Sequence, residues 1–181
     1  SSYIVIGDSK DATSLDNMAQ TFDHMRYLNN LRNSLGLEEL KVTHTMMAYA
    51  QADADYSDSV IGHAQQFNVG ENLAWNWGSN PYAQWYDEEK EIFDKTAVSI
   101  GQTQELLGKD AYDFYKAHAD SFNYGEIGHY LNDINPDYKV TGFAVSDRGT
   151  KYGYTYSQVF YFNTSEVAYT VDEYEQLFLN Y

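Results

Sequence analysis

Four side chains that can bind a metal ion, two histidines and two carboxylates, come from three separate segments of the chain. The first segment runs from His63 to Asn72 and includes Glu71, and its pattern is too irregular for one helix or one strand. The second contains Glu88 within a predicted helix, and the third places His129 between a glycine and a tyrosine. Because imidazole and carboxylate are both zinc ligands, these residues form a candidate metal-ligand set. The rest of the chain must fold to bring them together.

Each of these residues also has a purely structural interpretation. His63 fits a surface loop, and His129 alone carries no specific signal. At about 100° per residue, Glu89 falls nearer than Glu88 to the centre of the apolar face of its helix. Glu88 lies at the margin of that face, from which a carboxylate can reach into a cleft. The helical period does not choose between these two glutamates.

Other chemistry has little support in the sequence. There is no Gly-x-Ser-x-Gly, no His-Glu-x-x-His, no phosphate loop and no dinucleotide fingerprint. His118 is predicted to be semi-buried on a helix face, whereas His24 and His44 are assigned to the surface. The 18 tyrosines are typical of a core and a sheet surface, and they also fit a groove for carbohydrate or lipid.

The charge balance excludes some classes of partner. With 11 Lys and Arg against 27 Asp and Glu, the net charge is −16, which argues against nucleic acid and against binding anionic membranes by charge. An acidic surface suits the attraction of divalent cations. The absence of cysteine excludes disulfides and thiolate chemistry. No apolar run approaches the ~20 residues of a membrane span, and the Ser-Ser start without Met or signal peptide is typical of a processed or excised fragment.

Apolar periodicity predicts helices in the first part of the chain and strands in the last. The predicted helices cover residues 14–36, 43–59, about 81–95 and about 103–119, with a last short one after Thr170. The predicted strands cover 139–146 and 152–163, joined by a hairpin turn. This order indicates an α+β domain whose antiparallel sheet is covered by helices. We expect a single domain over residues 14–181, preceded by an extension or linker at 1–13.

A core can be predicted from the first helix. Its period places one row of apolar side chains on a single face, which we expect to pack against the sheet that contains Phe143 and Val159. That row consists of Leu15, Phe22, Met25 and Leu28.

Several stretches in fixed order carry a resemblance to a known family. They are Leu31–Leu37 with Leu40, the alanine-rich second helix, His63 with Gly70–Ala74, Trp85–Glu88, Gly128–Tyr130 and the stretch 132–142. Together they resemble the CAP superfamily, which comprises cysteine-rich secretory proteins, antigen 5 and pathogenesis-related class 1 proteins, and in particular its bacterial, SCP-like branch. The resemblance extends from about Leu15 to Phe162.

The resemblance implies a three-layer α–β–α sandwich with a central, mainly antiparallel sheet. It also implies a secreted or cell-surface protein whose cleft holds His63, Glu71, Glu88 and His129. In the family the two histidines bind a divalent metal, often zinc, with the glutamates nearby, and the motif spacing favours Glu88 over its neighbour. The lack of cysteine fits a bacterial member, and the sterol-binding loop of fungal members has no clear counterpart.

Two functions follow as hypotheses. The first is an extracellular module that binds a metal and a ligand or partner, such as a lipid, a carbohydrate or a host or cell-surface protein, without catalysis. The second is a metal-assisted, peptidase-like hydrolase in which Glu71 or Glu88 acts as general base. A third interpretation is that the four residues only brace the cleft.

Overall fold

A four-stranded sheet lies at the centre of the structure, a computed structural model that describes residues 2–181. The strands are β1 (Lys41–Val42), β2 (Gly70–Asn76), β3 (Val140–Thr150) and β4 (Gly153–Tyr161). Their order in the sheet is β1-β3-β4-β2, with β1 parallel to β3 and the other two pairs antiparallel. The predicted hairpin corresponds to β3 and β4, and the prediction of a mainly antiparallel sheet is confirmed.

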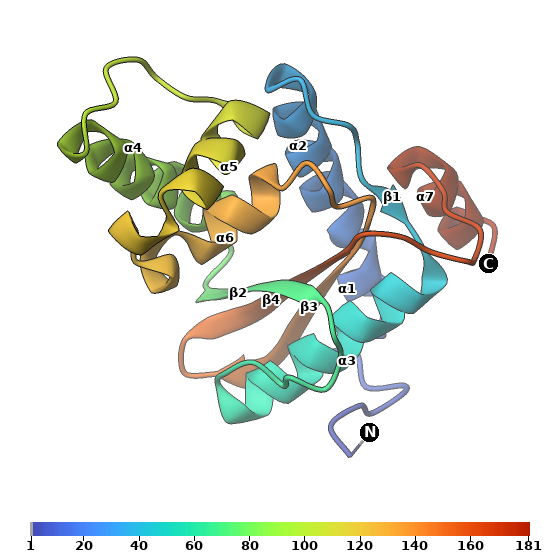
Figure 1. The fold of residues 1–181 in the computed structure, drawn as a ribbon. Coiled ribbons are helices and arrows are strands. Elements are labelled where there is room, and N and C mark those ends of the chain that lie inside the picture. The colour runs from blue at the N-terminus through green and yellow to red at the C-terminus, as the bar shows by residue number, and fades with distance from the viewer. Residues whose placement is uncertain (1) are drawn as a thin grey trace.

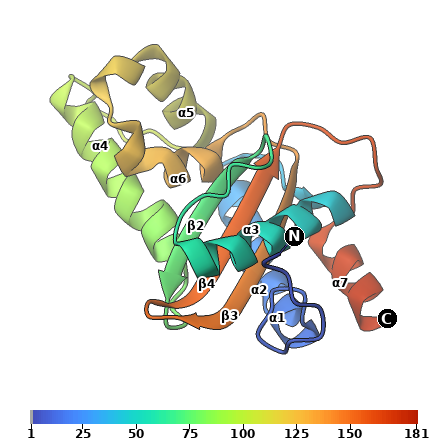
Figure 2. The same cartoon turned by 90° about the horizontal axis from the view of Figure 1, so that it is seen from below.

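Helices cover both faces of this sheet, as Figures 1 and 2 show. One face is covered by α3 (His44–Val60), whose small side chains Ala50 and Ala54 pack on Val159. The other face carries a larger aromatic core beneath α2 (Thr21–Ser34), α4 (Glu89–Ser99) and α6 (Tyr124–Ile134). The three-layer α–β–α sandwich is therefore confirmed.

Gly142 in β3 allows α3 to approach the sheet closely. A Cβ atom at this position would overlap the backbone of Met46, which lies in α3. Side chains alternate between the faces of a strand, so Gly142 points towards α3 while its neighbour Phe143 points into the aromatic core. The small face of α3 and the glycine of β3 thus fit each other.

The first predicted helix differs from its observed form in two respects. It is divided at Gln20 into α1 (Leu15–Ala19) and α2, and the prediction that Leu15 is buried is wrong, since it is 60% exposed. The other three members of the row, Phe22, Met25 and Leu28, are buried as expected. Because the helix restarts at Gln20, Leu15 no longer shares their face. Val159 also lies on the opposite face of the sheet from these residues.

The remaining helices lie around these layers. They are a π-helix at Ala83–Glu88, α5 (Gly108–Ala117), a 3-10 turn at Ala119–Ser121 and α7 (Val171–Leu179). Thr170 caps α7 in a reciprocal arrangement with Glu173, as expected from its residue type. Sequence periodicity missed β2 and α6. Within residues 2–181, no helix has both the length and the apolar character needed to cross a membrane.

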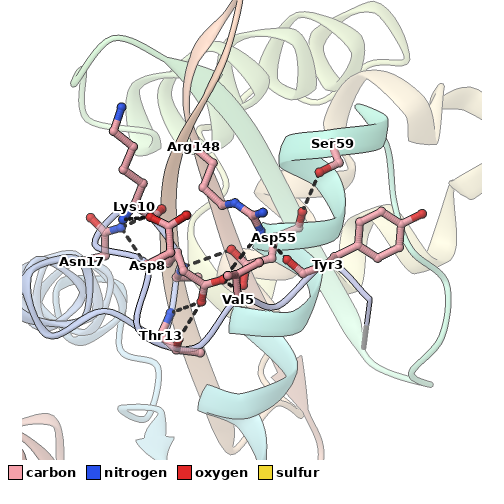
Figure 3. Close-up of polar contacts among 11 residues, drawn as sticks. Tyr3, Val5, Asp8, Lys10, Thr13, Asn17, Asp55, Ser59 and Arg148 are labelled. Atoms are coloured by element: carbon pink, nitrogen blue, oxygen red, sulfur yellow. Dashed lines mark hydrogen bonds and ion pairs between the residues drawn. The ribbon is translucent and has the colours of Figure 1, made fainter.

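The segment before α1 is bound to the domain by polar contacts, although its described part, residues 2–14, contains no helix or strand (Figure 3). The N–H of Ala12 donates to Oδ1 of Asp55 in α3 at 3.0 Å, and Ala12 is 1% exposed. Asp11 accepts the N–H of Val5 at 2.6 Å, while Arg148 of β3 donates to the carbonyl of Tyr3. The segment predicted to be an extension or linker therefore packs on both α3 and β3.

Candidate functional site

His63 and Glu71 form a hydrogen-bonded pair beside α3. Nδ1 of His63 lies 2.6 Å from Oε1 of Glu71, and the other oxygen of Glu71 accepts the hydroxyl of Ser157 at 3.2 Å. The Glu71 side chain is only 9% exposed, whereas that of His63 is 48% exposed. Since a carboxylate stabilises an imidazolium, the hydrogen bond to Glu71 raises the pKa of His63 above its ordinary value.

A strained loop carries His63 to this position. Ile61 and Gln65, two residues on either side of the histidine, both adopt positive φ angles, of 56° and 53°. Non-glycine residues rarely occupy this region, and such conformations cluster at functional sites. Glu71 follows on β2, where its side chain points to the α3 face of the sheet. The loop and the strand together explain why residues eight positions apart can pair.

Asp53 completes this cluster, and sequence reasoning missed it. Its carboxyl group lies on the buried face of α3 and is 4% exposed. Burial, followed by the hydrogen bond to Glu71 and the charge of that residue, raises the pKa of Asp53 to about 8. Because two neighbouring carboxylates repel each other, a proton is held at this pair more readily than on an isolated carboxyl group. The sequence feature that could have identified Asp53 is its position on the same helical face as Ala50 and Ala54.

The second histidine pairs with Glu89. Oε1 of Glu89 lies 2.5 Å from Nδ1 of His129, and Oε2 accepts the N–H of Tyr130 at 2.9 Å. Glu89 is 7% exposed, whereas Glu88 is exposed and has no hydrogen bond among residues 2–181 through its side chain. The residue that pairs with His129 is thus Glu89, as the helical period indicated. The motif spacing had indicated Glu88 for this position.

A π-helix immediately precedes Glu89. It spans Ala83–Glu88 and includes Trp85, whose indole N–H is fixed by a 2.9 Å hydrogen bond to the carbonyl of Leu73 in β2. Glu89, the first residue after it, faces α6, whereas Glu88 is exposed.

A buried network of amides connects α6 to β2 on the face away from α3. Asn72 donates to Oδ1 of Asp133 at 3.0 Å and to the carbonyl of His129 at 3.3 Å, and it accepts from Asn132 at 2.8 Å. Burial raises the pKa of Asp133. Arg32, itself buried, donates to the carbonyl of Asp133 at 2.8 Å and thereby binds α2 to the end of α6. This network positions the Glu89–His129 pair.

The structure shows two histidine–glutamate contacts, His63 with Glu71 and His129 with Glu89. Glu71 points to the α3 face of β2, whereas Asn72, the next residue, donates to the backbone carbonyl of His129. Zinc sites in proteins use three or four protein ligands. No group of three or more His, Cys, Asp or Glu side chains able to hold a metal ion exists in the described chain.

Three hollows surround Val69, which lines all of them. The first, of about 400 Å³, lies between the start of α3 and the segment after β4. The second, also of about 400 Å³, contains Glu71 and the edge of α6. The third, of about 250 Å³, is lined by Asp53, His63 and Glu71. The site is thus a set of adjoining surface hollows around Val69.

The sequence matches the cysteine-rich secretory protein family, CAP, over residues 25–162. Its fold resembles the crystal structure of NaASP2 with Zn²⁺, with a TM-score of 0.51 at 14% identity over 86% of each chain. It also resembles BmVAL-1, with a TM-score of 0.50 at 14% identity over 84% of this chain and 81% of that one. No curated protein matches the sequence.

A cysteine-rich secretory protein from Staphylococcus aureus aligns with 81% of this chain at 12% identity and a TM-score of 0.47. The present chain spans only 39% of the length of that protein. At these levels of identity the similar structures establish the fold, while the functional site has to be argued from the chain's own residues.

Proposed function

The chain belongs to the CAP family of cysteine-rich secretory proteins, and on this premise we propose that it is a secreted or surface-displayed binding module without catalytic turnover. Its ligand site is the depression around Val69, next to the pair of His63 and Glu71. The observation that supports this proposal most directly is the set of contacts made by the Glu71 side chain. Its carboxylate contacts His63 on one oxygen and Ser157 on the other, and it lies beside the buried Asp53.

A carboxylate held in this way supports the walls of the depression. A general base must reach the proton that it removes in a suitable geometry. Both oxygens of Glu71 contact neighbouring side chains, and both oxygens of Glu89 contact His129 and Tyr130. The hydrolase alternative also requires a metal-ligand group, and residues 2–181 contain no group of three or more candidate ligand side chains.

The remaining properties agree with an extracellular binding role. The net charge of −16 disfavours nucleic acid and anionic membrane surfaces. The rigid sheet and α3 hold the depression on regular elements, while its rim comes from loops, which is the usual arrangement of binding sites.

The test compares hydrolysis with stability in one set of proteins. Wild type, Glu71→Gln and the exposed control Glu88→Gln are assayed against a broad panel of peptides and esters, with and without added zinc, and their Tm is measured. We expect no turnover in any of them, a lower Tm for Glu71→Gln and an unchanged Tm for Glu88→Gln. Wild-type turnover that disappears in Glu71→Gln at unchanged Tm would overturn the proposal.

A further inference from the structure

We propose that the ligand is a neutral oligosaccharide, bound along a groove made of the first two hollows. This inference rests on the proposed binding function and specifies its ligand class. The two hollows, each of about 400 Å³, adjoin at Asn68, Val69 and Tyr161, which line both of them. A volume of this size is typical of small-molecule sites, which take ligands of about 300–1,000 Å³.

Aromatic rings stand along this groove in fixed orientations. Tyr49, which lines the first hollow, stacks on Phe67 with ring centroids 3.9 Å apart and an interplanar angle of 13°. Phe162 in the second hollow is 49% exposed and lies 4.9 Å from the ring of Tyr138. Sugar rings present an apolar C–H face, which packs on such rings. Because each ring is held by another, binding costs little side-chain entropy.

The polar groups of the groove suit hydroxyl groups. The side-chain amides of Asn68 and Asn163 and the hydroxyls of Tyr49 and Tyr161 make no hydrogen bond to another part of the described chain. Amides and phenols both donate and accept, as sugar hydroxyls do. Glu166, which accepts the N–H of Thr45 at 3.3 Å, places a carboxylate in the same lining.

The side chains that line the groove argue against anionic and against apolar ligands. Neither hollow has a lysine or an arginine in its lining, as far as the chain is described, so that phosphate, sulfate and uronate groups find no partner there. The surrounding protein is strongly acidic and repels anions. The lining also contains too many amides and hydroxyls for an acyl chain or a sterol, whose burial would leave these groups without hydrogen bonds.

Calorimetric titration with cellohexaose, maltohexaose, chitohexaose and the corresponding trisaccharides tests this inference. Heparin hexasaccharide and sodium oleate serve as the anionic and the apolar probe. We expect at least one neutral hexasaccharide to bind, and more tightly than its trisaccharide, because the ligand spans two hollows. Cosedimentation with insoluble cellulose and chitin then distinguishes a wall polysaccharide from a free oligosaccharide as the source.

Variants locate the binding in the groove. Tyr161→Ala should weaken it by about tenfold, a typical effect for one aromatic contact. Tyr152→Ala, at an exposed tyrosine in the β3–β4 turn, should not change it. If Tyr161→Ala fails to fold, the double substitution Asn68→Ala and Asn163→Ala, at two exposed residues, serves instead and should weaken binding similarly.

The outcomes separate this inference from the proposed function. Three results would overturn the saccharide inference. They are binding of oleate or heparin alone, no binding of any neutral saccharide at millimolar concentration, and saccharide binding that both sets of variants leave unchanged. The first of these results still supports a binding module. If the saccharide is bound and also cleaved, as chromatography of the products would show, the ligand class is correct and the proposal of a module without turnover fails.

Discussion

The Nδ1 atom of His129 lies 2.5 Å from Oε1 of Glu89, and the adjacent N–H of Tyr130 donates to the other oxygen of the same carboxylate. A carboxylate oxygen only accepts, so in this hydrogen bond the Nδ1 atom carries the hydrogen. One carboxylate at the start of α4 therefore orients both a side chain and a backbone group of α6. This relationship assigns Glu89 to a role in holding α4 against α6.

Glu89→Gln should destabilise the protein by about 1–3 kcal/mol. The substitution replaces one of the two accepting oxygens by an NH2 group, which then faces the N–H of His129 or of Tyr130 without being able to accept its hydrogen bond. Glu88→Gln, one residue earlier and exposed, should stay within about 0.5 kcal/mol of wild type. Urea denaturation of the three proteins measures both values. If Glu88→Gln were the more damaging change, the register after the π-helix would have to be the one that the motif spacing indicated.

Asp53 should make the protein less stable as the pH rises. Its pKa is raised from 3.8 to about 8 in the folded state, so the folded state binds the proton more tightly than the unfolded state. The contribution of this proton to the free energy of unfolding is fully present below pH 3.8 and is lost as the pH rises towards 8. The loss is no more than about 1.4 kcal/mol per pH unit. The raised pKa of His63 acts in the same direction.

Asp53→Asn keeps a donor for Glu71 and removes this titration. Its stability should depend less on pH than that of wild type between pH 5 and 8, with the two proteins most different at the alkaline end. Asp120→Asn, at an exposed aspartate, serves as the control and should follow wild type. Thermal unfolding at each pH provides the measurement. Parallel curves for wild type and Asp53→Asn would show that Asp53 does not hold its proton in the fold.

Gly142→Ala should destabilise the protein by about 1–3 kcal/mol or more, because the added methyl group overlaps the backbone of Met46 and forces α3 away from β3. Gly62→Ala is the matched control, since a Cβ at Gly62 meets no atom within 4 Å. Denaturant midpoints compare the two variants. An unaltered midpoint for Gly142→Ala would mean that α3 is not packed as closely on the sheet as the structure shows.

Zinc should add little stability to this protein. A ligand at 100 times its Kd stabilises a fold by about 2.7 kcal/mol, so a resident site would raise Tm strongly when chelator-treated protein receives zinc. We expect a small shift, equal in wild type and His63→Ala, and less than one equivalent of bound metal by elemental analysis. Stoichiometric zinc that is lost in His63→Ala, and lost on acidification below pH ~6.5, would instead show that the histidines meet in one site.

Local sequence was enough to predict the parts of the fold that depend on neighbours along the chain. Thr43 and Thr170 cap α3 and α7 because a hydroxyl before a helix accepts a free backbone N–H. The buried row of Phe22, Met25 and Leu28 follows from the helical period alone. The family motifs placed His63 and Glu71 in one segment, and these two residues do pair.

Tertiary structure decided the parts in which separate elements meet. Asp53 joins Glu71 only because α3 packs on the face of β2 to which Glu71 points, and no local pattern defines that face. Glu89 pairs with His129 because it faces α6, and this contact decides between the residue indicated by the helical period and Glu88, which the motif spacing indicated. Glu71 and Asn72 serve different partners because neighbouring strand residues point to opposite faces of a sheet, and burial on each side holds them there.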